Sequence, residues 1–260
     1  MDQQIWGDVS IEDGAVRYFT LGNLHLWLKY HNKEVWIAHG YSDNFEKKPK
    51  ADAPPKNHDW SRWAHKLGSG SLKILPVFPD MPLMVHSEYE LKVSPQTHIQ
   101  IFTRIPVWVR ICLSKNNYVL VELPTIKLSR TWFGSPVEGE LCYHATTKAR
   151  RDLARVEQKP YLVSCPISIT NKSEGELNFE RFCFRVERLS MFEHASDLWA
   201  DETEILYQGG DSHSEVIMTG KLPKGMSRKN LLTQPRKKIK VSLATRTFKR
   251  FFRDLNLLGH

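Results

Sequence analysis

Hydrophobic and polar residues alternate along most of this chain, which is the pattern of β-strands that bury one face. Near the N-terminus, two consecutive runs place their apolar residues on one face: Leu24, Leu26, Leu28, Val35 and Ile37. The residues His-Asn-Lys-Glu at 31–34 separate the two runs. The pattern predicts a β-hairpin with one buried face, and a Lys- and Pro-rich linker completes this first region, 1–58.

Short alternating runs recur from residue 59 to residue 220, divided by turn signals. We therefore expect a mainly β fold, an antiparallel β-sandwich over 59–220, with two packed β subdomains as the alternative. Thr146–Gln158 interrupts the alternation and places Ala149, Leu153 and Val156 at helical spacing. This interruption predicts a short inserted helix or a long ordered loop.

The last region, 221–260, is a basic tail whose end has helical periodicity. At about 100° per residue, one narrow arc of a helix collects Phe248, Phe251, Phe252, Leu255 and Leu258. The opposite arc collects Arg246, Lys249, Arg250 and Arg253. The spacing predicts a C-terminal amphipathic helix, which is too short to be stable without a surface to pack on.

Charge separates this tail from the rest of the chain. Residues 221–260 carry 12 Lys and Arg against one Asp, and the other 220 residues carry 25 Lys and Arg against 28 Asp and Glu. Such a tail suits the chain's own acidic body, a groove on a protein partner, or an anionic membrane. The candidate residues for partner or membrane contact are Arg236, Lys237, Lys238, Lys240, Phe248, Lys249, Arg250, Phe251, Phe252 and Leu255.

Familiar catalytic and cofactor motifs are absent from the sequence, which contains no P-loop, GxGxxG, GxSxG or HExxH pattern. The cysteines match no zinc spacing and are expected as reduced thiols in buried strands. We expect no metal and no cofactor, because the sequence brings only pairs of ligands together. With no apolar run that could cross a membrane and no signal peptide, we expect a cytoplasmic protein, peripheral to the membrane if the tail binds lipid.

Candidate ligand-binding groups gather in residues 123–152. They are Ser129, Arg130, Trp132, His144, Arg150 and Arg151. Gly134-Ser135-Pro136 predicts a tight turn, and polar donors beside Trp132 could hold an anionic or polar ligand. The alternative interpretation is a turn and an edge strand with a solvated basic face.

The same stretch, LSRTWFGSPVEGELCYHATTKARRD, resembles the signature region of the "domain of unknown function 432" family. The resemblance extends to Trp60-Ser61-Arg62-Trp63, ILPVFPDMPLMV, SCPISITN and RLSMFEHASDLW, and so covers most of residues 1–220. The family has no established activity and defines no catalytic residues. Some of its members are encoded near genes for mechanosensitive channels, which hints at work linked to membranes.

Two functions of different classes follow. The first is a non-catalytic binding or assembly module that engages a protein partner, itself membrane-associated in one version, or an anionic membrane surface. The second is a small-ligand binding protein or enzyme for sugars or anionic metabolites that uses the polar cluster at 129–151. Self-association is compatible with either function. Nucleic acid is disfavoured, because the tail lacks interleaved aromatic and basic residues on a groove-forming scaffold.

Overall fold

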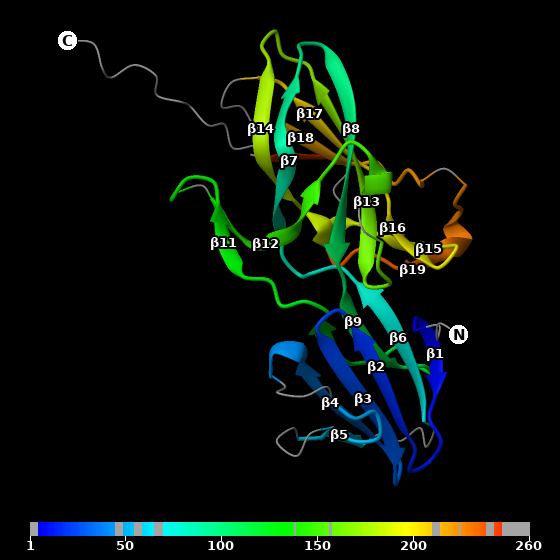
Figure 1. Cartoon of the computed structure of the whole chain (residues 1–260). Helices are drawn as coiled ribbons and strands as arrows, with labels where there is room; N and C mark the ends of the chain where they lie inside the picture. Colours follow the sequence, from blue (N-terminus) through cyan, green and yellow to red (C-terminus); the bar gives the residue numbers. More distant parts are fainter. Residues whose placement is uncertain are drawn as a thin grey trace, which may run out of the picture. The chain divides into compact units, whose positions relative to one another are not determined.

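The computed structural model describes residues 5–44, 49–54, 59–64, 70–137, 139–155, 158–209, 214–223, 225–237 and 242–245. Over these residues the chain is mainly β, as predicted, and its strands form four sheets (Figure 1). The helical segments described are 3-10 turns: η1 (Ser42–Asn44), η2 (Leu153–Arg155), η3 (Val186–Arg188) and η4 (Arg228–Asn230).

The chain divides into two compact units that interleave in the sequence. The first unit contains Met1–Pro79, Pro106–Lys127 and Lys159–Leu162. The second unit contains Asp80–Ile105, Leu128–Gln158 and Val163–His260. The boundary expected after residue 58 therefore falls inside the first unit, and the boundary expected after residue 220 falls inside the second.

One sheet of the first unit is assembled from strands that are distant in the sequence. Its order is β1 (Gly7–Ser10), β6 (Ser71–Val77), β9 (Trp108–Leu113) and β10 (Val119–Pro124), all antiparallel. Leu72 pairs with Leu113 and Ile74 with Ile111, and these four residues are buried. The buried residues of β6 therefore depend on β9, which belongs to the second segment of this unit, Pro106–Lys127.

The other sheet of the first unit contains the predicted hairpin. Its order is β2 (Val16–Leu21), β3 (Leu24–His31), β4 (Glu34–Tyr41) and β5 (Ser61–Ala64). Asn32 and Lys33 both have positive φ, which is the two-residue turn that matches the twist of a hairpin. The prediction of one buried face is wrong, because Trp27 is also buried and its Nε1 donates to the Lys50 carbonyl.

The second unit contains a mixed four-stranded sheet. Its order is β11 (Arg130–Phe133), β12 (Glu140–Ala149), β7 (Leu83–Val93) and β14 (Leu177–Phe184). β12 runs parallel to β7, and the other neighbours are antiparallel. The short helix or long ordered loop predicted over Thr146–Gln158 is wrong for its first four residues, because they continue β12. The short 3-10 turn η2 follows at Leu153–Arg155.

The largest sheet also belongs to this unit. Its path is β19 (Leu231–Thr233), β15 (Met191–His194), β16 (Asp197–Ala200), β13 (Leu162–Asn171), β17 (Thr203–Tyr207), β18 (Ser214–Met218) and β20 (Ser242–Thr245), with β8 (Thr97–Pro106) also paired to β13. β13 is parallel to β16 and β17 and is buried along almost its whole length. The sheets are thus mixed as well as antiparallel, and the sandwich packing stays a prediction.

Part of the predicted tail belongs to this large sheet. β19 and β20 lie within residues 221–260, and β20 pairs antiparallel with β18 from Ser214↔Thr245 to Ile217↔Ser242. The amphipathic helix predicted from Arg246 onward lies outside the described residues and stays a prediction.

Candidate binding surface at the β11–β12 hairpin

The β11–β12 hairpin places the first candidate residues on one face of its two strands. Arg130 pairs with Tyr143, and Trp132 pairs with Leu141. Because side chains two residues apart share a face of a strand, these four side chains lie on the same side. Gly134 has a φ of 109°, a conformation that glycine tolerates, at the point where the chain leaves β11.

Trp132 is held firmly although it is half exposed. Its indole Nε1 donates to the Ser135 carbonyl at 2.8 Å. Gly139 lies against the ring so closely that a Cβ there would be 2.1 Å from Nε1. The exposed fraction of Trp132 is 50%. The hairpin therefore presents a large aromatic surface whose orientation is already fixed.

Two further apolar residues of the hairpin face outward beside this tryptophan. Leu141, the cross-strand neighbour of Trp132, is 44% exposed, and Val137 in the connecting turn is 91% exposed. Most of the large hydrophobic side chains in the described part of the chain are buried. Three exposed apolar side chains in one hairpin are therefore unusual for this protein. Exposed apolar groups gathered in one place are typical of interaction sites.

The opposite face of the hairpin is anchored in the second unit. Cys142 and Phe133 pack with Met84 and Cys183 in a buried cluster. Burial raises the pKa of Cys142 to about 11, so its thiol stays protonated. At the edge of the cluster, Arg185 forms an ion pair with Glu140. The hairpin is thus packed on the second unit through one face and partly exposed through the other.

The structure separates the other candidate ligand-binding residues. His144 follows Tyr143 and so lies on the face of β12 opposite Arg130. Its backbone N–H donates to the Ser129 carbonyl at 2.9 Å, which places Ser129 beside it through the main chain. The six candidates therefore do not converge on one site.

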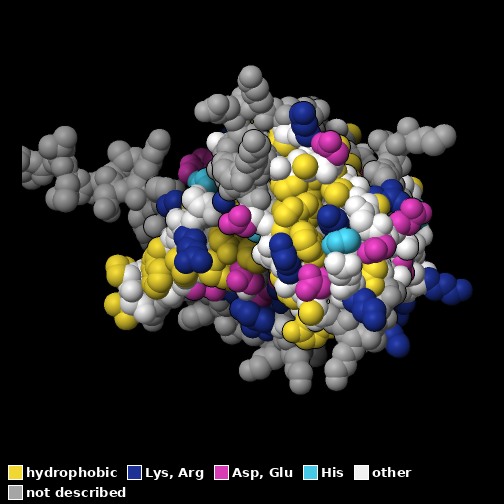
Figure 2. Space-filling view, turned by 90° about the horizontal axis from the view of Figure 1, so that it is seen from below, with side chains coloured by type: hydrophobic (Ala, Val, Ile, Leu, Met, Phe, Trp, Pro, Cys, Tyr) yellow, Lys and Arg dark blue, Asp and Glu magenta, His cyan; other side chains and the backbone are white. Residues whose placement is uncertain are grey.

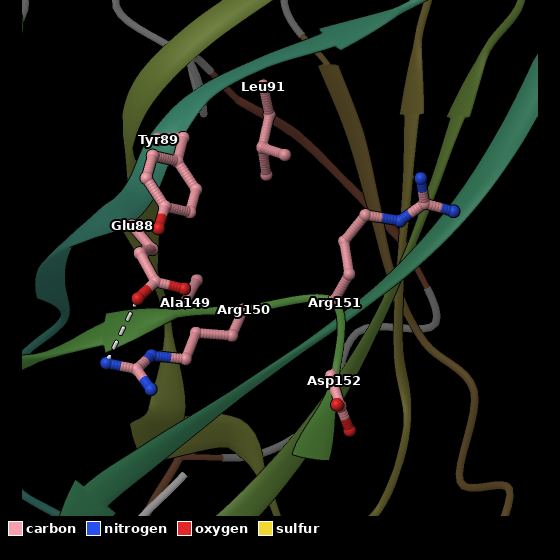
Figure 3. Close-up of a pocket in the computed structure, with 7 residues that line it drawn as sticks. All are labelled: Glu88, Tyr89, Leu91, Ala149, Arg150, Arg151 and Asp152. Carbon is pink, nitrogen blue, oxygen red and sulfur yellow. Dashed lines mark ion pairs between the residues drawn. The ribbon is translucent and has the colours of Figure 1, made fainter. Parts of the chain in front are cut away.

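Arg150 and Arg151 line a shallow pocket of about 180 Å³ at the end of β12 (Figure 3). Arg150 Nη2 lies 3.3 Å from Glu88 Oε1, and its backbone pairs with Phe102 of β8. The side chain of Arg151 points to the other side of the pocket, away from Arg150 (Figure 3). The two arginines therefore do not form one anion clamp.

The beginning of the basic cluster in the tail contacts the second unit itself. Lys237 Nζ lies 3.5 Å from Glu187 Oε1, and its backbone N–H donates to the Glu187 carbonyl at 3.0 Å. Burial raises the pKa of Glu187, and the charges of Lys237 and Arg188 oppose that shift. At Lys237 the geometry favours the interpretation in which the tail docks on the chain's own acidic group.

Arg236, the residue before Lys237, is half-buried, and the other eight candidates of the tail follow it. They lie outside the described residues: Lys238, Lys240, Phe248, Lys249, Arg250, Phe251, Phe252 and Leu255. Among the side chains coloured by type in Figure 2, acidic and basic ones are intermingled with hydrophobic ones.

Sequence reasoning missed a row of basic side chains on the face of the sheet that carries His144. The register places Lys148 of β12 and Arg181 of β14 directly beside His86 of β7. The ring of His144 lies next to that of His86, with 5.3 Å between their centroids. No pattern within one segment of the sequence could have predicted that these residues lie together, because they come from three separate strands.

The part of the chain that the structure describes also bears on metal binding, on membrane-spanning helices and on the cysteines. Over those residues, no group of three or more His, Cys, Asp or Glu side chains is arranged to hold a metal ion. No helix there is long and apolar enough to span a membrane. All four cysteines are free and buried in strands, as predicted.

Comparison with known proteins gives a family and no function. The sequence matches the family described as "Protein of unknown function (DUF432)" over residues 5–253. No curated protein and no solved structure matches the chain.

Proposed function

The chain belongs to the DUF432 family of proteins of unknown function, so we propose its function from its own geometry: it is a non-catalytic binding module whose β11–β12 hairpin docks on a protein partner. The observation that supports this proposal is the rigid, half-exposed Trp132 beside Leu141 and Val137. Fixed aromatic side chains bind with little loss of conformational entropy and dominate the energy of many interfaces.

Charge favours a protein over an anionic bilayer as the occupant of the hairpin. Residues 128–141 contain one basic residue, Arg130, and two acidic residues, Glu138 and Glu140. Binding to an anionic membrane is normally supported by an excess of Lys and Arg near the surface. A mixed rim around an apolar centre is instead the usual composition of a protein interface.

We extend the proposal to the basic C-terminal segment. The pairing of β20 with β18 fixes the chain up to Thr245 at an edge of the large sheet. The amphipathic helix predicted after that point would therefore start from a fixed position on the second unit. It would provide a second contact, with the partner or with the membrane to which a partner is attached.

Site-specific crosslinking tests the hairpin directly. A photoreactive amino acid at position 137 should crosslink to one partner in cells, whereas the same group at Tyr118, an exposed residue of the first unit, should not. With the purified partner, Trp132→Ala should weaken binding about thirtyfold, because a central aromatic anchor contributes roughly 2 kcal/mol. Tyr118→Ala serves as the matched control and should bind like the original chain.

Two results would contradict this function. Equal affinity of the Trp132→Ala variant and the original chain for the crosslinked protein would exclude the hairpin as the docking site. Co-sedimentation with anionic vesicles that is lost in Trp132→Ala, together with crosslinks to lipid alone, would assign the hairpin to a membrane instead.

A further inference from the structure

The shallow pocket at the end of β12 lies where this strand leaves its neighbour. β12 pairs with β7 as far as Ala149↔Ser87, and Arg150 then pairs with Phe102 of β8 through backbone hydrogen bonds of 2.7 and 2.8 Å. Within the described residues, β12 therefore pairs with no residue of β7 beyond Ser87. The pocket, of about 180 Å³, opens at this point (Figure 3). Two segments line it: Glu88, Tyr89 and Leu91 of β7, and Ala149, Arg150, Arg151 and Asp152.

A bulge in β7 places Tyr89 at the rim of this pocket. The register of β7 with β14 shifts here, so that residues 87–90 of β7 lie opposite a single residue of β14, Glu180. The hydroxyl of Ser87 contacts the carbonyl oxygens of Glu180 and Tyr89 and so fixes the bulge. Bulges redirect side chains and are common beside functional sites. The Tyr89 ring is 71% exposed and is open to a ligand.

The charged groups of the pocket differ in whether they already have partners. Glu88 Oε1 lies 3.3 Å from Arg150 Nη2, and Asp152 Oδ1 accepts from the Ala154 N–H at 2.9 Å. Within the part of the chain that the structure describes, the Arg151 side chain forms no ion pair and no hydrogen bond. The pocket therefore offers one guanidinium to a ligand, while both of its carboxylates are engaged.

The size and the apolar side chains of the pocket define the rest of the ligand. Ala149 is buried and Leu91 is half-buried, so part of the lining is apolar. An apolar cavity of about 150 Å³ is enough to hold a benzene ring. Figure 3 shows the ring of Tyr89 and the guanidinium of Arg151 on different sides of the pocket. A six-membered ring that stacks on Tyr89 can therefore carry an acidic group toward Arg151.

We propose that this pocket binds a monocyclic aromatic carboxylate. The ligand ring lies against Tyr89 and Leu91, and its carboxylate accepts hydrogen bonds from Arg151, because the guanidinium fork matches the two carboxylate oxygens. A cationic ligand is disfavoured, because both carboxylates of the pocket are engaged and Arg151 would repel it. The pocket lies at the opposite end of β12 from the hairpin turn, so this site goes beyond the docking function proposed for the hairpin and does not depend on it.

Benzoate is the probe for the full-length protein. Saturation-transfer NMR should show saturable binding of benzoate with a Kd on the order of 1 mM, since so small a ligand makes few contacts. Benzamide keeps the ring but has no charge, and it should bind about tenfold more weakly because the charge-assisted hydrogen bonds are lost. Cyclohexanecarboxylate keeps the charge but has no aromatic ring, and it should bind about threefold more weakly.

Two variants, each with a matched control, assign this binding to the pocket. Arg151→Gln should weaken the binding of benzoate about tenfold, and Tyr89→Ala should weaken it about threefold. Lys148→Gln removes an exposed cation of β12 outside the pocket, and Tyr118→Ala removes an exposed tyrosine of the first unit. Both controls should bind benzoate like the original chain. The inference is overturned if benzoate shows no saturable binding, if benzamide binds equally well, or if Lys148→Gln weakens binding as much as Arg151→Gln does.

Further measurements identify the source of the ligand and separate this site from the hairpin. N-acetylphenylalanine carries the ring and the carboxylate of a peptide C-terminus. Tighter binding of this compound than of benzoate supports the end of a peptide chain as the ligand, and weaker binding supports a free aromatic acid. Unchanged thermal unfolding temperatures confirm that the variants fold. Trp132→Ala should bind benzoate normally, and Arg151→Gln should bind the partner of the hairpin normally, so the failure of one function is distinguishable from the failure of the other.

Discussion

Asn171 shows how single polar residues stabilise the second unit. It is fully buried, yet its amide nitrogen donates to the carbonyls of Val93, Ser94 and Gly175. Its oxygen accepts from the backbone N–H and the hydroxyl of Ser173. A buried polar side chain whose hydrogen-bonding groups are satisfied ties together the segments that it contacts.

Asp201 is a buried residue whose charge opposes folding. Its Oδ1 accepts from the Ser190 N–H at 3.0 Å, and burial raises its pKa from the ordinary 3.8 to about 6. A raised carboxyl pKa means that the folded state holds the proton more tightly than the unfolded state does. The contribution of protonated Asp201 to the free energy of unfolding is therefore fully present below about pH 4. It is lost as the pH rises through about 6.

Asp201→Asn should remove this pH dependence. The amide keeps an oxygen that can accept from Ser190, so the variant should be close to the original chain in stability near pH 4. Near pH 7 it should be more stable, by at most about 3 kcal/mol. Urea unfolding at several pH values measures the difference. Asp59→Asn, at an exposed carboxylate, should show no such trend; a constant difference between Asp201→Asn and the original chain at every pH would refute the assignment.

At the scale of elements, the conformation of the hairpin depends on the contact between Trp132 and Gly139. A Cβ at residue 139 would lie 2.1 Å from Trp132 Nε1 and 2.6 Å from the Ser135 carbonyl oxygen. Gly139→Ala should therefore displace the indole and destabilise the second unit by about 1–3 kcal/mol, the usual cost of overpacking. Gly175→Ala is the control, because nothing lies within 4 Å of a Cβ there.

The measurement for Gly139→Ala combines stability with a local signal. Tryptophan indole NMR should show the Nε1–H resonance of Trp132 shifted in Gly139→Ala and unchanged in Gly175→Ala. An unshifted resonance and equal stability of the two variants would mean that the hairpin tolerates the extra methyl group, and the fixed orientation of Trp132 would then be in doubt.

Alternation in the sequence predicted the strands well and their partners poorly. The runs at Leu24–His31 and Glu34–Tyr41 were expected as a hairpin, because a short turn leaves them one way to pair. Thr146–Ala149 was misjudged, since Ala149, Leu153 and Val156 share a helical spacing by coincidence while β7 pairs with the start of this stretch. Hydrophobic alternation does not show which strands pair in parallel, as β12 does with β7 and β13 does with β17.

The candidate site was predicted in part for the same reason. Trp132 and Arg130 were found because they are close in the sequence. His86 and Arg181 were missed, because only the register of β7 with β14 brings them beside Lys148. His144 was selected for the wrong neighbours, since it faces His86 rather than Arg130.

For the whole molecule, the interleaving of the two units predicts which fragments can fold. Met1–Pro79 contains β1 and β6 but lacks β9, which covers Leu72 and Ile74. We expect this fragment to show no cooperative thermal unfolding and a poorly dispersed NMR spectrum. A fusion that joins residues 1–79 through a Gly/Ser linker to 106–127 supplies β9 and β10 and should recover a transition. A well-dispersed spectrum from 1–79 alone would contradict this dependence.

The same interleaving affects how the protein is made on the ribosome. The first unit is complete only when Lys159–Leu162 has been synthesised, about 80 residues after Pro79. At roughly 5–20 residues per second, the nascent chain carries an unfinished unit for several seconds. Until β9 has also been synthesised, β6 lacks the strand that pairs with it, and its apolar residues expose the growing chain to aggregation.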